Sequence, residues 1–398
     1  MKTTQVQCGY LPLVDSAPLI LAKELKFAAE EGLELILKQQ PSWSALRDRL
    51  AFGHLDFAHM LSPMPIAMSL GLGLAGSPVP VDALMVLSVN GTVIGVSTDL
   101  HEKMRRSDWT NNFDDPDATA RAIFANAPKP LRIGVPFPFS MHRMLLEYWL
   151  SRHPEFASDV EIVTVPPPQM ADAMRDGILD MFCVGEPWGS VAMQRGDAVL
   201  ILPGERVWQF APEKVLGARH DWIAENADTC GAMMRAIYKA SEWMNRAENI
   251  PLAIEILTQS QHLNLSGDVI EPALSGNITP DARGAQGIAV NRFLSFHSGA
   301  ANFPWRSQAC WIADRLATWH GLNQEETRQI ARGCFRCDLF RDALNGHGVD
   351  MPGASEKVEG ALPYATAVAS TKGQMILGPD TFFDGALFDF GSEKTIKK

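Results

Sequence analysis

Four residues suited to holding a small anion are spread along the sequence: Trp43, His142, Gly185 and Lys214. The lysine offers a positive charge, the indole and imidazole offer N–H donors, and a glycine leaves its backbone amide uncovered. Neither paired carboxylates nor an activated nucleophile accompanies them, although acid/base or covalent catalysis would need such groups. The four residues therefore indicate that an anion is held rather than transformed, and we expect a binding protein, not an enzyme.

Each residue also has an ordinary structural interpretation. Lys214 could be a solvated lysine whose stem lies on apolar surface, and His142 could be a surface histidine near the start of a helix. Trp43 could be a core side chain, and Gly185 could simply follow a strand in a loop. The choice between these readings depends on the elements that position the residues.

Residues 179–184 form an apolar run too short for a helix, and Gly185 and Pro187 end it abruptly. The run reads as a buried strand, and ligands of open α/β sheets bind beyond the carboxyl ends of such strands. Function should therefore be sought around Gly185.

This strand closes the second copy of a repeated strand–helix pattern. The first copy places strands at 5–10, 33–38 and 55–58, with helices at 17–31 and 43–52. Asp15 or Ser16 could cap its first helix, and Ser42 its second. The second copy has strands at 131–135, 160–165 and 179–184, with helices at 141–151 and 169–175. A duplicated unit predicts two α/β lobes with a ligand cleft between them.

Two strands at 83–89 and 92–96, separated by the turn-forming pair Asn90-Gly91, could carry the chain from one lobe to the other. We assign residues 1–96 to the first part of lobe 1 and residues 97–204 to lobe 2. Residues 205–398 return to lobe 1 and add a mainly helical C-terminal extension.

Composition excludes several classes of protein. The 398 residues carry a net charge of −11 and are 46% hydrophobic, which is typical of a globular protein and argues against a direct nucleic-acid partner. We find no apolar run of the ~20 residues that would span a bilayer, so no membrane partner is expected. The residues after Met1 show no export signal, and the six cysteines are mostly isolated. Both features favour a cytoplasmic protein.

The pair Cys334 and Cys337 is a lone CxxC motif, and a zinc site would need two further ligands that no nearby spacing provides. We predict no cofactor and no metal.

Five strings, in this order, make the chain resemble the nitrate-binding and bicarbonate-binding proteins of the NrtA/CmpA family over nearly its whole length. They are Ser-Trp-Ser-Ala-Leu-Arg-Asp at 42–48, Ala-His-Met-Leu-Ser-Pro-Met-Pro at 58–65, Val-Pro-Pro-Pro-Gln-Met at 165–170, Phe-Cys-Val-Gly-Glu-Pro-Trp at 182–188 and Pro-Glu-Lys-Val-Leu-Gly at 212–217. The resemblance implies a two-lobed type II periplasmic-binding-protein fold that closes on one planar oxyanion.

By position, the resemblance places Trp43, His142, Gly185 and Lys214 around the ion. Nitrate-binding members carry a glutamine after an Asn-Gly pair, where this chain has Thr92. This departure leaves the fifth contact in doubt and could alter the preference between nitrate and nitrite. Bicarbonate-binding members pair their ion with calcium, but this sequence shows no clear acidic cluster for it.

With no export signal recognised, the chain looks most like the cytoplasmic NasS-type nitrate and nitrite sensors. Such a sensor would hold a NasT-like antiterminator with an RNA-binding ANTAR domain inactive until the anion binds, and so control nitrate assimilation. The alternative is the solute-binding component of a nitrate, nitrite or bicarbonate ABC transporter. A third alternative is an enzyme on the same fold, like the pyrimidine-forming enzymes of thiamin synthesis, but their cysteine-rich motif is absent.

Overall fold

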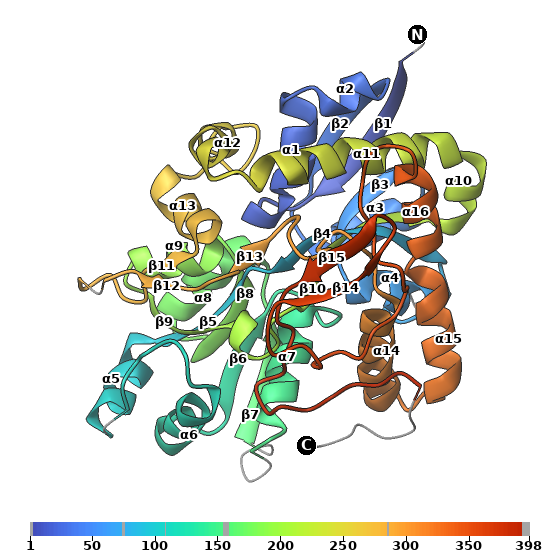
Figure 1. The fold of residues 1–398 in the computed structure, drawn as a ribbon. Helices are drawn as coiled ribbons and strands as arrows, with labels where there is room; N and C mark the ends of the chain where they lie inside the picture. Colours follow the sequence, from blue (N-terminus) through green and yellow to red (C-terminus); the bar gives the residue numbers. More distant parts are fainter. Residues whose placement is uncertain (1–2, 74–75, 108, 154–158, 285, 392–398) are drawn as a thin grey trace.

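Two separate β-sheets, each flanked by helices, give the protein two α/β lobes (Figure 1). The computed structural model describes residues 3–73, 76–107, 109–153, 159–284 and 286–391. Within these residues, no helix is both long and apolar enough to cross a lipid bilayer.

The first lobe is built on a six-stranded sheet with the strand order β13-β4-β10-β3-β1-β2. Strands β1, β2 and β3 run parallel, whereas β10 is antiparallel to both of its neighbours. The strands are β1 (Thr4–Tyr10), β2 (Leu33–Gln39), β3 (Phe57–Leu61), β4 (Val81–Asn90), β10 (Pro212–Arg219) and β13 (Leu294–Ser295). The helices between its first four strands are η1 (Val14–Ser16), α1 (Ala17–Glu24), α2 (Phe27–Glu30), α3 (Trp43–Ala51) and α4 (Pro63–Ser69).

The second lobe is built on a five-stranded sheet with the order β7-β6-β8-β5-β9. Strand β6 is parallel to both β7 and β8, while β5 is antiparallel to its neighbours β8 and β9. The strands are β5 (Thr92–Ser97), β6 (Leu131–Val135), β7 (Val160–Thr164), β8 (Met181–Gly185) and β9 (Ala198–Pro203). The helices are α5 (Thr98–Arg106), α6 (Pro116–Asn126), α7 (Met141–Leu150), η3 (Pro167–Gln169), α8 (Met170–Arg175) and α9 (Trp188–Gln194).

The repeated pattern predicted from the sequence is present, with local differences. The helix expected over 17–31 is broken in two, because Lys26 adopts a left-handed conformation with φ 65° between α1 and α2. The third strand begins at Phe57 rather than residue 55. Ser42 caps α3 as expected, since its Oγ accepts a hydrogen bond from the backbone N–H of Ala45 at 3.2 Å.

The Asn90-Gly91 turn joins the two sheets instead of forming a hairpin, because β4 and β5 pair with different neighbours. Both residues have positive φ, 61° and 89°. The Asn90 side chain also fixes the returning chain: its Nδ2 donates to the Gln209 carbonyl at 2.9 Å and its Oδ1 accepts from the Ala211 N–H at 3.1 Å. One side chain thus ties together the two segments that cross between the lobes.

The C-terminal half is mainly helical, as the sequence predicts, and it contacts both lobes. Helices α14 and α15 pack on α4 of the first lobe, whereas Tyr148 of α7 in the second lobe donates through its hydroxyl to Asp384 at 2.8 Å. The red segment of Figure 1 shows this tail running across the molecule. The elements after β9 are η4 (Gly204–Arg206), α10 (His220–Glu225), α11 (Ala227–Met244), η5 (Ala247–Asn249), α12 (Ile250–Leu257), α13 (Gly267–Ser275), β11 (Asn277–Ile278), β12 (Ile288–Ala289), α14 (Arg306–His320), α15 (Gln324–Cys334), α16 (Cys337–Leu344), β14 (Thr366–Ser370) and β15 (Gly373–Leu377).

Candidate functional site

A fully buried lysine, Lys214, lies at the centre of the candidate site. Its ammonium Nζ is 2.8 Å from Glu213 Oε1 and 2.6 Å from Asp15 Oδ2. Neighbouring residues of a regular strand point to opposite faces of the sheet. Here the pairing of β10 with β4 is irregular on both sides of Lys214, and such a bulge redirects side chains. The Glu213 carboxylate and its neighbour's ammonium group can therefore meet.

Asp15 and His59 complete this charged cluster. Asp15 lies in η1 just after β1, and its Oδ1 is 3.0 Å from Nε2 of His59 on β3. Burial alone would raise the pKa of Asp15, but Lys214 and His59 outweigh it and lower the pKa to about 2. Burial would likewise lower the pKa of Lys214, and the two carboxylates raise it instead. Both groups of the Asp15–Lys214 pair are therefore charged at neutral pH.

Trp43 begins α3, directly after the Ser42 cap, and is buried rather than exposed. The centroid of its ring is 5.5 Å from Lys214 Nζ and 5.9 Å from the ring centroid of His59. Among the described residues, no acceptor binds the indole Nε1–H. A buried donor of this kind usually has a partner, so Nε1 is available to a ligand.

His142 comes from the other lobe and lies in the first turn of α7, where Ser140 caps the helix. Its Nδ1 is 3.2 Å from Glu213 Oε1, but neither ring nitrogen makes a well-directed hydrogen bond to any described residue. Burial, followed by the charge of Lys214, lowers the pKa of His142 well below the usual value. The imidazole is therefore neutral and can present one N–H.

Gly185 ends β8 and faces the same space. A Cβ added there would lie 3.6 Å from His142 Nε2 and 3.7 Å from Asp15 Oδ2. Thr92 pairs directly with Gly185 across the two strands. Its buried Oγ1 makes no well-directed hydrogen bond in the part of the chain that the structure describes, and a Cβ added at Gly204 would lie 2.0 Å from it.

The structure thus brings four of the predicted residues into one cluster, from both lobes. Contacts link Trp43 to Lys214, and Lys214 through Glu213 to His142, whose Nε2 faces Gly185. Thr92 reaches this cluster through its pairing with Gly185. The surface interpretations of Lys214 and His142 are wrong, because both side chains are buried. The unpartnered polar atoms point to a small polar ligand.

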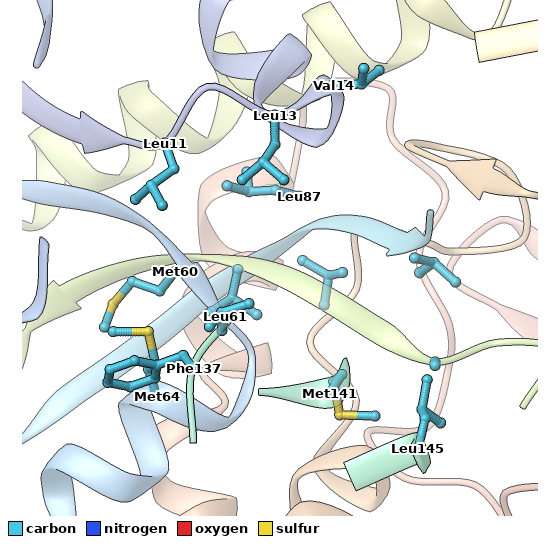
Figure 2. Packing of buried hydrophobic residues seen from close by; sticks show 14 of the residues in the cluster. Leu11, Leu13, Val14, Met60, Leu61, Met64, Leu87, Phe137, Met141 and Leu145 are labelled. Carbon is cyan, nitrogen blue, oxygen red and sulfur yellow. The ribbon is translucent and has the colours of Figure 1, made fainter. Parts of the chain in front are cut away.

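Elements that carry members of the cluster also carry buried apolar side chains. Figure 2 shows Leu13 on the loop after β1 pointing toward Leu87, and Met141 and Leu145 projecting from the helix that carries His142. All four are buried. Charges interact more strongly where apolar groups exclude water, so the attraction between a bound anion and the ammonium of Lys214 would be little screened.

Sequence reasoning missed three members of the cluster: Asp15, His59 and Glu213. Asp15 or Ser16 was expected to cap the first helix. Ser16 holds the α1 cap position but makes no side-chain capping bond, and Asp15 pairs with Lys214 and His59 instead. His59 stands in an otherwise apolar buried strand, and a buried histidine needs a polar partner. That requirement was the available signal. Across the described ranges, no group of three or more His, Cys, Asp or Glu side chains is arranged to hold a metal ion.

Two hydrogen bonds hold the lobes together beside the cluster. Trp188 Nε1 at the start of α9 donates to the Pro12 carbonyl at 2.9 Å, and the Val14 N–H donates to the Glu186 carbonyl at 2.9 Å. Both join the loop after β1 to the end of β8. The structure therefore represents a closed arrangement of the two lobes.

We expect Trp188→Phe to weaken ligand binding by about two- to twelvefold, because one hydrogen bond of the closed state is lost at a cost of about 0.5 to 1.5 kcal/mol. Calorimetric titration with the anion would measure the change. Trp149→Phe is the matched control, since Trp149 Nε1 donates to the Pro116 carbonyl at 3.0 Å within the second lobe. The control should lower the melting temperature and leave affinity unchanged. Equal loss of affinity in both variants would contradict the assignment of Trp188 to lobe closure.

Comparison with known proteins places this site in context. The chain is 32% identical over 404 residues to "Nitrate/nitrite binding protein NrtA" of Nostoc sp., covering 98% of this chain and 84% of that protein. It is 30% identical to the protein of the same name from Synechococcus elongatus, covering 96% and 83%. A match to "Nitrate import ATP-binding protein NrtC" of Synechocystis sp., at 32% identity, covers 87% of this chain but only 51% of that protein.

Solved structures agree with the observed architecture. The crystal structure of the periplasmic nitrate-binding protein NrtA from Synechocystis matches with a TM-score of 0.84 and 27% identity over 98% of this chain and 96% of that chain. The alkanesulfonate-binding protein SsuA from Xanthomonas axonopodis matches with a TM-score of 0.56 and 16% identity over 81% and 96%, a likeness of fold alone. The predicted two-lobed periplasmic-binding-protein fold is confirmed.

A family model described as the NMT1-like family matches residues 1–258, about two thirds of the chain. This range contains every member of the buried cluster, from Asp15 to Lys214. The chain belongs to the NMT1-like family and is similar to the nitrate-binding proteins named above.

Proposed function

We propose that the protein binds nitrate or nitrite at the buried cluster between its two lobes. The observation that carries this proposal is the buried ammonium of Lys214, surrounded by donors from both lobes whose hydrogen bonds are unmade among the described residues. Similarity to proteins named for nitrate and nitrite binding supports the choice of anion.

The donor set suits a small planar oxyanion. Trp43 Nε1 and the imidazole of His142 are rigid donors at the starts of two helices, one in each lobe. Gly185 has no side chain to cover its backbone amide, and Lys214 supplies the balancing charge. An anion that contacts both lobes favours the closed state, because only that state makes all of its contacts.

Isothermal titration calorimetry with nitrate, nitrite and bicarbonate tests the proposal. We expect saturable binding of nitrate or nitrite at one site per chain, with the anion recovered unchanged afterwards. Since Thr92 stands where nitrate-binding relatives are expected to carry a longer glutamine, the ratio of the two affinities would show how the shorter side chain affects selectivity. No heat with any of the three anions would overturn the proposal.

We further propose that the protein is a cytoplasmic sensor that controls a NasT-like ANTAR antiterminator. The sequence resemblance to NasS-type sensors supports this role. Anion binding would close the lobes and weaken the surface that holds the partner, which is a coupling between two sites. The competing proposal is a solute-binding component of an ABC transporter. It is supported by the similarity to the NrtA and NrtC proteins reported above.

Copurification distinguishes the two roles. A sensor should form a complex with the ANTAR protein that falls apart when nitrate or nitrite is added, at anion concentrations that saturate the calorimetric site. A transporter component should not copurify with the ANTAR protein. It should instead stimulate ATP hydrolysis by a reconstituted permease complex when the anion is present. The two results exclude each other in a purified system.

A further inference from the structure

Glu213 is placed to act on the anion site through His142. Its Oε1 lies 2.8 Å from Lys214 Nζ and 3.2 Å from His142 Nδ1. Its Oε2 is buried and accepts no hydrogen bond from any residue that the structure describes. An ionised carboxylate would leave that oxygen desolvated without compensation, whereas a carboxylic acid is neutral.

Charge counting favours the neutral form once an anion is bound. With Glu213 ionised, Asp15, Glu213 and a monoanion would face the single positive charge of Lys214 in a buried space. A proton on Glu213 removes one of those three negative charges. Because like charges in a desolvated site repel strongly, binding of the anion and binding of a proton assist each other.

The state of Glu213 also decides what His142 can offer. A neutral imidazole carries one N–H, on either Nδ1 or Nε2. An ionised Glu213 attracts the hydrogen to Nδ1 and leaves a lone pair on Nε2, the atom that faces Gly185. A protonated Glu213 can instead donate to Nδ1, which leaves the hydrogen on Nε2 and directed into the site.

We propose that Glu213 is a positioning residue for the anion: it takes up a proton when the anion binds, donates a hydrogen bond to His142 Nδ1, and so holds His142 with its Nε2–H toward the anion. This inference rests on the proposed binding of nitrate or nitrite. It adds a proton to the binding reaction and assigns that proton to one side chain.

The groups that face Glu213 leave it as the one that titrates near neutrality. Burial raises the pKa of Glu213 to about 7, against the opposing charge of Lys214. Around it, the pKa of Asp15 is lowered to about 2, that of Lys214 is raised, and that of His142 is held well below its usual range. The pKa of Cys183 on β8 is raised, by burial and then by Glu213, and burial lowers that of His59 beside Asp15.

We expect nitrate binding to weaken as the pH rises. Glu213 is already protonated below its pKa of about 7, so binding takes up little proton there, and above that value the proton must be acquired from solution. For nitrate, which stays ionised throughout, we expect a larger proton uptake per anion at pH 8 than at pH 6. Nitrate affinity should fall about tenfold between these two pH values.

Calorimetry of the full chain with nitrate, at pH 6 and pH 8 in buffers of different ionisation enthalpy, measures the proton count directly. Glu213→Gln cannot ionise, so it should take up no proton at either pH and lose the tenfold dependence. Glu186→Gln is the matched control, because burial raises the pKa of Glu186 to about 7 as well, while its Oε2 accepts from the Ser190 N–H at 3.0 Å. This control should keep the proton uptake.

Each outcome decides the question. Zero uptake by the wild-type protein at pH 8, with nitrate bound, overturns the role of Glu213 and leaves the proposed function intact. Uptake that survives in Glu213→Gln, or that disappears in both variants, overturns it as well. Absence of nitrate binding at both pH values overturns this inference together with the proposed function. Uptake lost only in Glu213→Gln supports it.

Discussion

Replacing Lys214 by methionine is expected to weaken anion binding by at least about 100-fold, or about 2.8 kcal/mol. The ammonium is fully buried, and it is the positive charge that offsets Asp15 and Glu213 in the cluster. Without it, an incoming anion would meet two carboxyl groups and no compensating charge. Calorimetric titration with nitrate and nitrite gives the affinity.

The same substitution should also lower stability, because removing one partner of a buried ion pair costs about 3 to 5 kcal/mol. Lys357→Met is the matched control. Lys357 is also largely buried between two carboxylates, those of Glu359 and Asp380, in the C-terminal extension. Both variants should lose stability in urea unfolding, but only Lys214→Met should lose binding. Equal binding losses in the two variants would show that destabilisation, not the site charge, explains the effect.

A double variant separates the effect of the lost charge from the effect of the lost stability in Lys214→Met. Adding Asp15→Asn removes the carboxylate that the lysine paired with, so the double variant should recover much of the lost stability. Its anion binding should remain absent, since the positive charge is still missing. Recovery of binding in the double variant would contradict the role given to Lys214.

Gly185→Ala is expected to lower anion affinity by about 10- to 100-fold, or about 1.4 to 2.8 kcal/mol. The added methyl group would lie 3.0 Å from Leu13 Cδ2, closer than an ordinary contact, and would occupy the space in front of His142 Nε2. Leu13 belongs to the first lobe and Gly185 to the second. The methyl group therefore both fills the site and opposes closure, and overpacking of this kind typically costs about 1 to 3 kcal/mol.

Gly333→Ala makes the same chemical change in α15, where an added Cβ would meet no other described atom within 4 Å. It should leave affinity unchanged and raise helix stability by about 0.5 to 1 kcal/mol. Nitrate titration and thermal melting of both variants give the comparison. Undiminished binding by Gly185→Ala would mean that the anion does not approach this glycine.

The order and type of most elements could be predicted from the sequence, because they depend on local signals. Apolar runs of strand length, the Ser42 cap and the glycines that follow helices place β1, β2, α3 and β8 within a few residues of their observed bounds. Since Trp43 and His142 each follow a strand and begin a helix, the predicted elements also place them at the carboxyl ends of parallel strands in the two sheets. The sequence by itself therefore determined the two-lobed plan and four residues of the candidate site.

Burial and pairing were decided only by the tertiary structure. The meeting of Glu213 with Lys214 depends on an irregular register between β10 and β4, which alternation along a strand does not predict. Asp15, one of the two expected helix caps, instead pairs with Lys214, which lies nearly two hundred residues away in the sequence. The reason is that a buried ammonium is a stronger partner for a carboxylate than a backbone N–H. Such long-range electrostatic contacts exist only after the chain has folded, so local patterns carry no signal for them.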